Sequence, residues 1–248
     1  MPKNTRLDCP KALVILLAAL LAGCVDVPNS GITPPDYDAS MRIIYADPAL
    51  ATATLSIASN IGGTPAFTAY TDATAGSFGT SSEYVTYKAG SKKMYVKKAD
   101  GTLADTDTST VTLETQTVRS VVVLPKRAAA DARLLQIVER NTFRLPGIAD
   151  SARVRFVNCV ASKDTVDVWR IRGTSAPGVG NDNLRYATLS GFVHVPRDST
   201  WRFYVTRYSG STASISDTVS VVGASNKQYT IVLCDSLTRV KVFRFEDK

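Results

Sequence analysis

The chain has 248 residues, of which 44% are hydrophobic and 21% are charged, and its formal net charge is +7. This length and apolar content suffice for one or two folded cores, which excludes a chain too polar to fold. A basic balance favours an acidic partner such as anionic polysaccharide, or it reflects a solvated surface, and we expect no nucleic acid as a partner.

The N-terminus has the pattern of a secretory signal peptide. Lys3, Arg6 and Lys11 precede an uninterrupted apolar run from Ala12 to Ala22. A transmembrane helix needs about 20 apolar residues, roughly twice the length of this run. Basic, apolar and small residues in this order predict that residues 1–23 are removed on export.

The end of the signal peptide predicts a lipid anchor. Leu21-Ala22-Gly23-Cys24 resembles the bacterial lipobox, in which the cysteine becomes the first mature residue and carries lipid. Two or more acyl chains anchor a protein stably, at about 0.8 kcal/mol per buried methylene. The alternative is an ordinary signal peptide with a cysteine near its cleavage site. Residues 24–39, which are rich in proline and aspartate, then form an extended tether.

The remainder of the chain contains an internal repeat. The stretch FGTSSEYVTYKAG (Phe78–Gly90) aligns with YATLSGFVHVPRD (Tyr186–Asp198), and MYVKKADG (Met94–Gly101) aligns with FYVTRYSG (Phe203–Gly210). The spacing stays near about 110 residues, which is a common domain size. We therefore expect two tandem domains, residues 40–150 and 151–248.

Each copy is predicted to consist of strands, because segments rich in Val, Ile, Thr, Tyr and Phe alternate with Gly, Asp, Ser and Pro. In the first copy these segments are Met41–Tyr45, Thr52–Ile57, Tyr84–Tyr87, Met94–Lys98, Val111–Leu113 and Val118–Leu124. In the second copy they are Val154–Asn158, Val166–Ile171, Phe192–Val195, Trp201–Arg207, Ile215–Val222 and Tyr229–Cys234. Pro125–Glu139 has helical composition, although its end is alternatively a last strand. The pattern predicts an all-β protein with two tandem Ig-like or transthyretin-like β-sandwich domains.

Two stretches resemble a known family. GSFGTSSEYVTYKAGSKKMYVKK (Gly76–Lys98) and ARVRFVNCVASKDTVDVW (Ala152–Trp169) are similar to the bacterial domain-of-unknown-function family 4397. The resemblance lies in strand pattern and turn residues and covers nearly all of the mature chain. It implies an exported protein built from β-sandwich modules, and it implies no reaction and no site.

Residues typical of catalysis or metal binding are scarce. The chain has one histidine, His194, at a strand position that we expect to face solvent. No nucleophile elbow, phosphate-binding loop or zinc-protease motif is present. Asp100, Asp105 and Asp107 do not have the spacing of an EF-hand loop, so they predict a solvated turn, or alternatively a loop-bound calcium ion. We therefore predict a non-enzymatic protein with no cofactor and no metal.

Cys159 and Cys234 remain in the mature chain beside the lipidated Cys24. Each comes at or near the end of a predicted strand, and in sandwiches the first strand often pairs with a late one, so the two thiols could be adjacent. A disulfide between them would add about 2–4 kcal/mol of stability. The alternative is a pair of buried free thiols.

Two equivalent strands combine cations with tyrosine. Period-two alternation directs Lys93, Tyr95 and Lys97 outward in one copy and Arg202 and Tyr204 outward in the other. Such a face could stack on sugar rings or bind anionic groups. Alternatively, its cations only protect an exposed sheet from aggregation.

Together these features predict a non-enzymatic, lipid-anchored cell-envelope protein with a binding, adhesion or scaffold role. We expect it to be exported to the outer membrane or cell surface, with anionic polysaccharide or an envelope protein as its partner. The alternative is a carbohydrate-binding accessory module that serves a separate enzyme. The glycine-containing stretches Ser59–Phe67 and Gly173–Asn183 occupy equivalent places and are either binding loops or plain connections.

Overall fold

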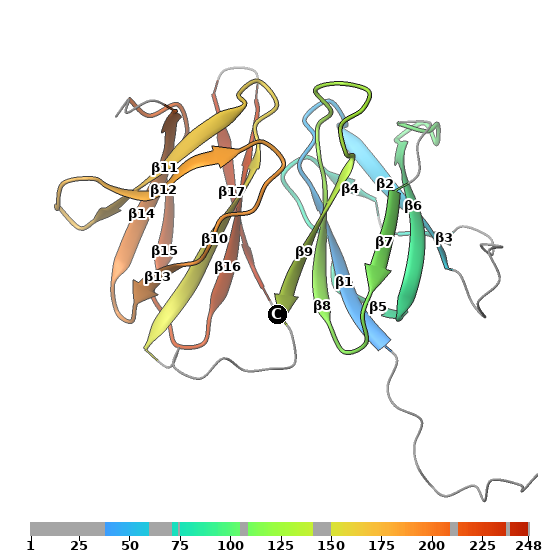
Figure 1. Ribbon diagram of the computed structural model, residues 1–248, viewed down its shortest axis with the longest axis horizontal. Coiled ribbons are helices and arrows are strands. Elements are labelled where there is room, and N and C mark those ends of the chain that lie inside the picture. Colours follow the sequence, from blue (N-terminus) through green and yellow to red (C-terminus); the bar gives the residue numbers. More distant parts are fainter. Residues whose placement is uncertain are drawn as a thin grey trace, which may run out of the picture. The chain divides into compact units, whose positions relative to one another are not determined.

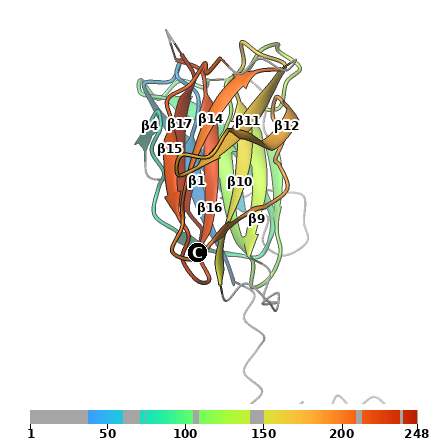
Figure 2. The ribbon, with the colours of Figure 1, turned by 90° about the vertical axis from the view of Figure 1, so that its left-hand side faces the viewer.

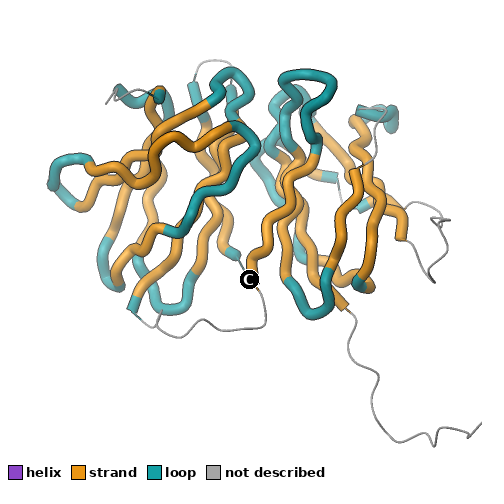
Figure 3. Tube along the Cα trace, viewed as in Figure 1, coloured by secondary structure: helices purple, strands orange, loops and turns teal. Residues whose placement is uncertain are grey.

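The computed structural model describes residues 38–59, 71–73, 75–104, 109–140, 150–208, 213–236 and 239–247. Within these ranges every regular element is a β-strand (Figure 3). The same ranges contain no helix that is long and apolar enough to cross a membrane. The signal peptide, Cys24 and all of the tether except its last residues lie outside them, so the anchor stays a prediction.

The strands fall into two series along the chain. The first series is β1 (Asp38–Tyr45), β2 (Thr52–Ser59), β3 (Thr71–Asp72), β4 (Gly76–Ser77), β5 (Val85–Lys88), β6 (Gly90–Lys98), β7 (Ser109–Leu113), β8 (Val118–Val123) and β9 (Leu134–Arg140). The second series is β10 (Ser151–Cys159), β11 (Thr165–Arg172), β12 (Gly178–Arg185), β13 (Val193–Pro196), β14 (Thr200–Arg207), β15 (Val219–Val222), β16 (Gln228–Cys234) and β17 (Lys241–Glu246).

Each series forms two sheets that pack face to face, and the strand orders match. We call β5-β1-β8-β9 and β13-β10-β16-β17 the inner sheets, and β3-β2-β6-β7 and β12-β11-β14-β15 the outer sheets. In both inner sheets the two central strands are parallel, with Ile43 opposite Val121 and Phe156 opposite Ile231. The all-β fold with two sandwiches, expected from the sequence, is confirmed.

The central inner strands β1, β8, β10 and β16 are buried on both faces over most of their length, so burial does not alternate along them as it does in a half-exposed strand. In β1, Ile43 faces the core inside the first sandwich, whereas Ile44 belongs to a different cluster. In β8, Val121 and Val122 divide in the same way. The outer strand β6 instead alternates, as a sheet with one buried face requires.

The described residues therefore form three hydrophobic cores. One fills each sandwich, and the third lies between the two inner sheets. The third core contains Ile44, Ala46, Val122, Leu124 and Ile137 from the first half and Val157, Cys159, Val232 and Cys234 from the second. Figure 1 shows the four sheets as successive layers, and in Figure 2 the long axes of most strands lie close to the vertical of the view. The sandwiches are thus joined through a shared core.

Aromatic residues at equivalent repeat positions reinforce this joint. Phe78 packs edge-to-face on Phe243 of the second half, with ring centroids 5.2 Å apart. Its counterpart Tyr186 donates a hydrogen bond to the carbonyl oxygen of Pro125 in the first half. Each half therefore reaches across to the other through the same position of the repeat.

Three expectations about elements need correction. Pro125–Glu139 contains no helix, and its end forms β9, because Ile137 is fully buried in the shared core. The second half of the stretch Gly173–Asn183 belongs to strand β12, which pairs with β11. Of the strand expected over Ile215–Val222, only Val219–Val222 forms a regular strand, which is β15. Most of the stretch Ser59–Phe67 lies outside the described residues.

Candidate functional site

The basic and aromatic residues of β6 lie as predicted. Met94 and Val96 are buried in the first core, whereas Lys93, Tyr95 and Lys97 are half-buried on the opposite face of the strand. Alternation along the strand therefore placed these side chains correctly.

This part of the first outer sheet is held by an ion pair. The Lys97 ammonium lies 2.9 Å from a carboxylate oxygen of Asp72 and 5.8 Å from the centroid of the Tyr95 ring. The hydroxyl of the buried Ser56 donates to the same carboxylate. The hydrogen bonds from Ser56 and Lys97 lower the pKa of Asp72. Lys97 is thus engaged by its own sheet.

The equivalent positions of β14 differ from the prediction. Arg202 is exposed as expected, but Tyr204 is only 7% exposed and so presents no open ring. The edge strand β12 carries two register shifts against β11, and such bulges bend a strand. On the same face Asp167, which is 6% exposed, accepts a hydrogen bond from the backbone N–H of Asn183. The bent edge strand therefore covers part of the face.

Trp169 takes the place that the sequence assigned to Tyr204. It is half-buried on β11, directly opposite Tyr204 on one side and Val179 on the other. Its indole Nε1 donates to the hydroxyl of Thr206 at 3.0 Å, which fixes the ring on the sheet. Alternation within TVDVWRIR would have found it, because burial of Val168 in the core directs Trp169 to the other face.

We call the surface formed by Trp169, Ile171, Val179 and Arg202 the Trp169 face. Ile171 lies opposite Arg202, and Val179 is 46% exposed. A fixed indole beside aliphatic groups and an exposed guanidinium offers a flat apolar platform with a hydrogen-bond donor at its edge. The two inner sheets lie between this face and the β6 residues (Figure 1), so the two predicted groups do not form one surface.

Cys159 and Cys234 lie directly opposite each other on the parallel strands β10 and β16. The predicted proximity is confirmed, but both cysteines are free thiols, fully buried in the shared core. Burial, followed by the hydrogen bond with Cys159, raises the pKa of Cys234. The pair therefore acts as small apolar side chains in the joint between the sandwiches.

Other residues singled out in the sequence lie apart. His194 is exposed on β13, as expected, with its Nδ1 3.3 Å from the Ser151 hydroxyl. Asp100 accepts hydrogen bonds from the backbone N–H and hydroxyl of Thr102, as a turn residue does, whereas residues 105–108 lie outside the described part. Across the described ranges, no three His, Cys, Asp or Glu side chains gather as metal ligands would.

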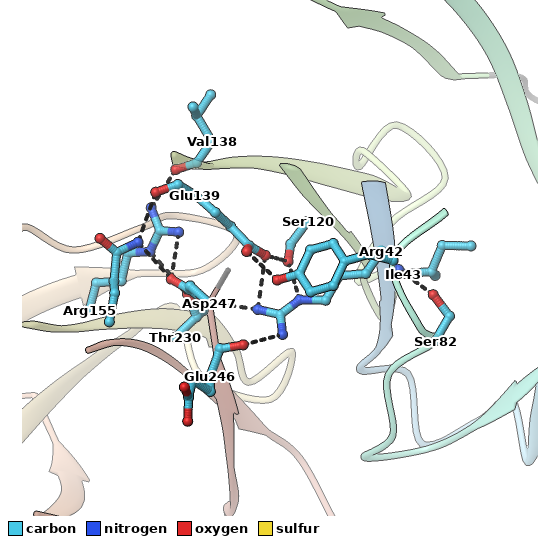
Figure 4. Close-up of polar contacts among 12 residues, drawn as sticks. Arg42, Ile43, Ser82, Ser120, Val138, Glu139, Arg155, Thr230, Glu246 and Asp247 are labelled. Atoms are coloured by element: carbon cyan, nitrogen blue, oxygen red, sulfur yellow. Dashed lines mark hydrogen bonds and ion pairs between the residues drawn. The ribbon is translucent and has the colours of Figure 1, made fainter. Parts of the chain in front are cut away.

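A buried polar cluster lies between the two halves (Figure 4). Arg42 of β1 donates to the Ser120 hydroxyl at 2.8 Å and to the carbonyl oxygen of Glu246 at 2.7 Å. Its remaining nitrogen lies 2.7 Å from Asp247 and 2.9 Å from Glu139. Both of these carboxylate side chains are fully buried.

Arg155 makes the equivalent contacts from the second half. It donates to the Thr230 hydroxyl at 3.0 Å, to the carbonyl oxygen of Val138 at 2.8 Å and to Asp247 at 3.0 Å. Each arginine thus bonds a hydroxyl of its own sheet and a backbone carbonyl of the other half. Burial lowers the pKa of Arg155 against the raising effect of Asp247 and Glu139. The cluster therefore links the two sandwiches through hydrogen bonds and ion pairs.

Aromatic rings close the cluster on both sides. The guanidinium of Arg42 lies 5.0 Å from the ring centroid of Tyr84, and that of Arg155 lies 5.2 Å from the ring centroid of Phe192. The Tyr84 hydroxyl donates to Glu139, and burial together with this carboxylate raises the pKa of Tyr84. The sequence analysis did not predict this cluster. Arg42 and Arg155 occupy equivalent positions of the two sandwiches, opposite Ser120 of β8 and Thr230 of β16.

The described residues thus define an all-β double sandwich with two exposed outer sheets. No protein-family model matches the sequence, and no curated protein matches it. The resemblance to family 4397 therefore stays a prediction.

Several solved structures are similar to the chain at low scores. One is a streptococcal virulence factor described as binding alpha-glucan, with 12% identity, 82% of this chain and 96% of that chain covered, and a TM-score of 0.27. Another is the C-terminal fragment of the pilus adhesin SpaC from Lactobacillus rhamnosus GG, with 8% identity, 84% and 97% covered, and a TM-score of 0.25. A third, from Parabacteroides distasonis, is named for cell adhesion, with 10% identity, 86% and 99% covered, and a TM-score of 0.23. Similarity at this level assigns neither a family nor a ligand to this chain.

Proposed function

We propose that the chain is a lipid-anchored cell-envelope protein of two sandwiches that has a binding or adhesion role and catalyses no reaction. The observation that carries this proposal is the Trp169 face, where a half-buried indole is fixed by Thr206 on an outer sheet. A ring held in place loses little conformational entropy on binding, which makes such residues effective anchors at binding surfaces. The joint between the sandwiches supports it, because a rigid body presents this face in a constant orientation.

The chemistry of the Trp169 face favours a saccharide as ligand. Sugar rings have apolar faces that stack on an indole and hydroxyl groups that accept hydrogen bonds from a guanidinium such as that of Arg202. This property supports an adhesin that binds polysaccharide, and it also supports the second candidate, a carbohydrate-binding accessory module that serves a separate enzyme.

The binding proposal is tested by Trp169→Ala against a glycan array and against isolated envelope polysaccharide. Loss of an aromatic anchor removes about 2 kcal/mol or more of binding free energy, roughly a 30-fold loss of affinity. Tyr95→Ala on the other outer sheet is the matched control and should bind like the unmodified chain. Equal binding by Trp169→Ala and the unmodified chain would show that this face is not the site.

The anchor is tested in native cells. Globomycin, which blocks the lipoprotein signal peptidase, should cause the uncut precursor to accumulate if Cys24 is lipidated. Protease treatment of intact cells should then degrade the sandwiches if they face outward. Normal processing in the presence of the drug would contradict the anchor and indicate a secreted protein.

A further inference from the structure

A cleft opens at one end of the second sandwich, apart from the Trp169 face. The β10–β11 turn, the β16–β17 turn and the segment after β14 enclose a volume of about 580 Å³. Three cations line it, Lys163, Arg207 and Arg239, against a single carboxylate, Asp235. The cleft therefore carries an excess of positive charge.

Two of these charges are already engaged. The carboxylate of Asp235 accepts hydrogen bonds from the backbone N–H and the hydroxyl of Ser162, both at 2.7 Å. Arg239 donates to the carbonyl oxygen of Ser216 at 2.6 Å and lies 3.2 Å from Asp217. Asp235 and Arg239 thus brace the walls of the cleft.

The other two cations are available to a ligand. Among the residues that the structure describes, neither Lys163 nor Arg207 forms a side-chain hydrogen bond or an ion pair. Residues 209–212 and 237–238, which lie outside the described ranges, contain no acidic residue. Like charges held near one another in a concave site raise the local positive potential, which favours an anion.

In the first sandwich, an apolar side chain that packs in the core occupies the position equivalent to Lys163. The backbone N–H of Leu50 donates to the carbonyl oxygen of Asp47 at 3.2 Å, and that of Lys163 donates to the carbonyl oxygen of Val160 at 3.1 Å. Leu50 and Lys163 are therefore equivalent residues of equivalent turns. Leu50 is 8% exposed and packs in the first core, whereas Lys163 lines the cleft. The fold does not require a cation here, which points to a ligand.

We propose that this cleft binds an acidic sugar, a ring that bears a carboxylate. Lys163 and Arg207 pair with the carboxylate, the three serines of the lining bond ring hydroxyls, and Ile215 and Val240 contact the apolar face of the ring. The volume lies in the range of small-molecule sites, about 300–1,000 Å³, and exceeds what a bare phosphate or sulfate ion needs. The site shares no residue with the Trp169 face, so either can fail without the other.

Calorimetric titration of the full chain in detergent tests this proposal with glucuronate, glucose and sodium sulfate as probes. The variants are Lys163→Leu, which introduces the residue of the first sandwich, and Arg207→Gln. The matched control is Lys98→Gln, because Lys98 is the exposed cation that ends β6 where Arg207 ends β14. Melting curves confirm that each variant folds.

We expect glucuronate to bind at least about 10-fold more tightly than glucose or sulfate, since charge-assisted hydrogen bonds discriminate by this factor or more. Each cleft variant should weaken glucuronate binding by a similar factor, Lys98→Gln should not, and added salt should weaken binding by the unmodified chain. Equal binding of glucuronate and glucose, or equal binding by unmodified chain and variants, would overturn the proposal. If sulfate binds as tightly as glucuronate, the proposal that the ligand is a sugar would be overturned, and the cleft would be a site for anions only.

Discussion

Removing the Asp247 carboxylate should uncouple the two sandwiches. Asp247 accepts hydrogen bonds from Arg42 at 2.7 Å and Arg155 at 3.0 Å, and also from Gln228 at 2.8 Å and Thr230 at 2.9 Å. In Asp247→Ala two buried guanidinium groups lose this carboxylate, while the cost of their burial remains.

The expected loss is about 3–5 kcal/mol of the free energy of unfolding, which is the usual effect of removing one partner from a buried ion pair. For a chain of this length each kcal/mol lowers the melting temperature by about 2–4 °C, so Tm should fall by about 6–20 °C. Because the cluster joins the halves, the variant should also unfold in two steps where the unmodified chain unfolds in one.

The assay is urea denaturation followed by circular dichroism and calorimetry, with Glu246→Ala as control. The substitution Glu246→Ala removes the same charge one residue away. The Glu246 carboxylate, however, is 48% exposed and pairs with Lys227, which is 47% exposed. An exposed pair contributes at most about 1 kcal/mol. A loss in Asp247→Ala no larger than that in Glu246→Ala, with unchanged cooperativity, would refute the assignment of the cluster as the joint.

Three further predictions concern stability and reactivity. Gly223→Ala should destabilise the fold by about 1–3 kcal/mol in urea titrations, because its Cβ would lie 1.9 Å from a neighbouring carbonyl oxygen, whereas Gly191→Ala, with open space around it, should be near neutral. Cys159 and Cys234 should resist iodoacetamide in the folded chain and react in urea, and a disulfide in the intact mass of unreduced protein would contradict the free thiols. Burial and then the neighbouring Tyr87 raise the pKa of Tyr45 to about 12, so its folded form holds the proton more tightly. The stability from this group should be complete below pH about 10 and decline toward pH 12. The phenolate absorbance of Tyr45, taken as the difference between the unmodified chain and Tyr45→Phe, should rise near pH 12 rather than near pH 10.

Local pattern in the sequence was sufficient for most of the strands and for the repeat. Alternation in KKMYVKK placed Met94 and Val96 in the core, because a side-chain period of two depends only on the extended backbone. The helical composition of Pro125–Glu139 gave a wrong prediction. Burial of Ile137 between two sheets depends on tertiary packing, and this packing overrode the local preference for a helix.

What covers each face was decided only in three dimensions. Alternation directs Tyr204 away from the core of its sandwich, but the bend of β12 and the presence of Trp169 decide that its ring is covered. Likewise, no spacing in the sequence indicates that Lys163 lines a cleft where Leu50 fills a core. Turn geometry and the neighbouring loops set that difference.

The sequence by itself determined that this chain is all-β, duplicated and basic, since these properties follow from composition, local periodicity and self-similarity. The tertiary structure alone decided that the two sandwiches share a third core, that Cys159 and Cys234 meet there, and that Arg42 and Arg155 share the carboxylate of Asp247. Such contacts join residues far apart in the chain, and their free energy depends on the exclusion of water from a surface that exists only after both halves have folded.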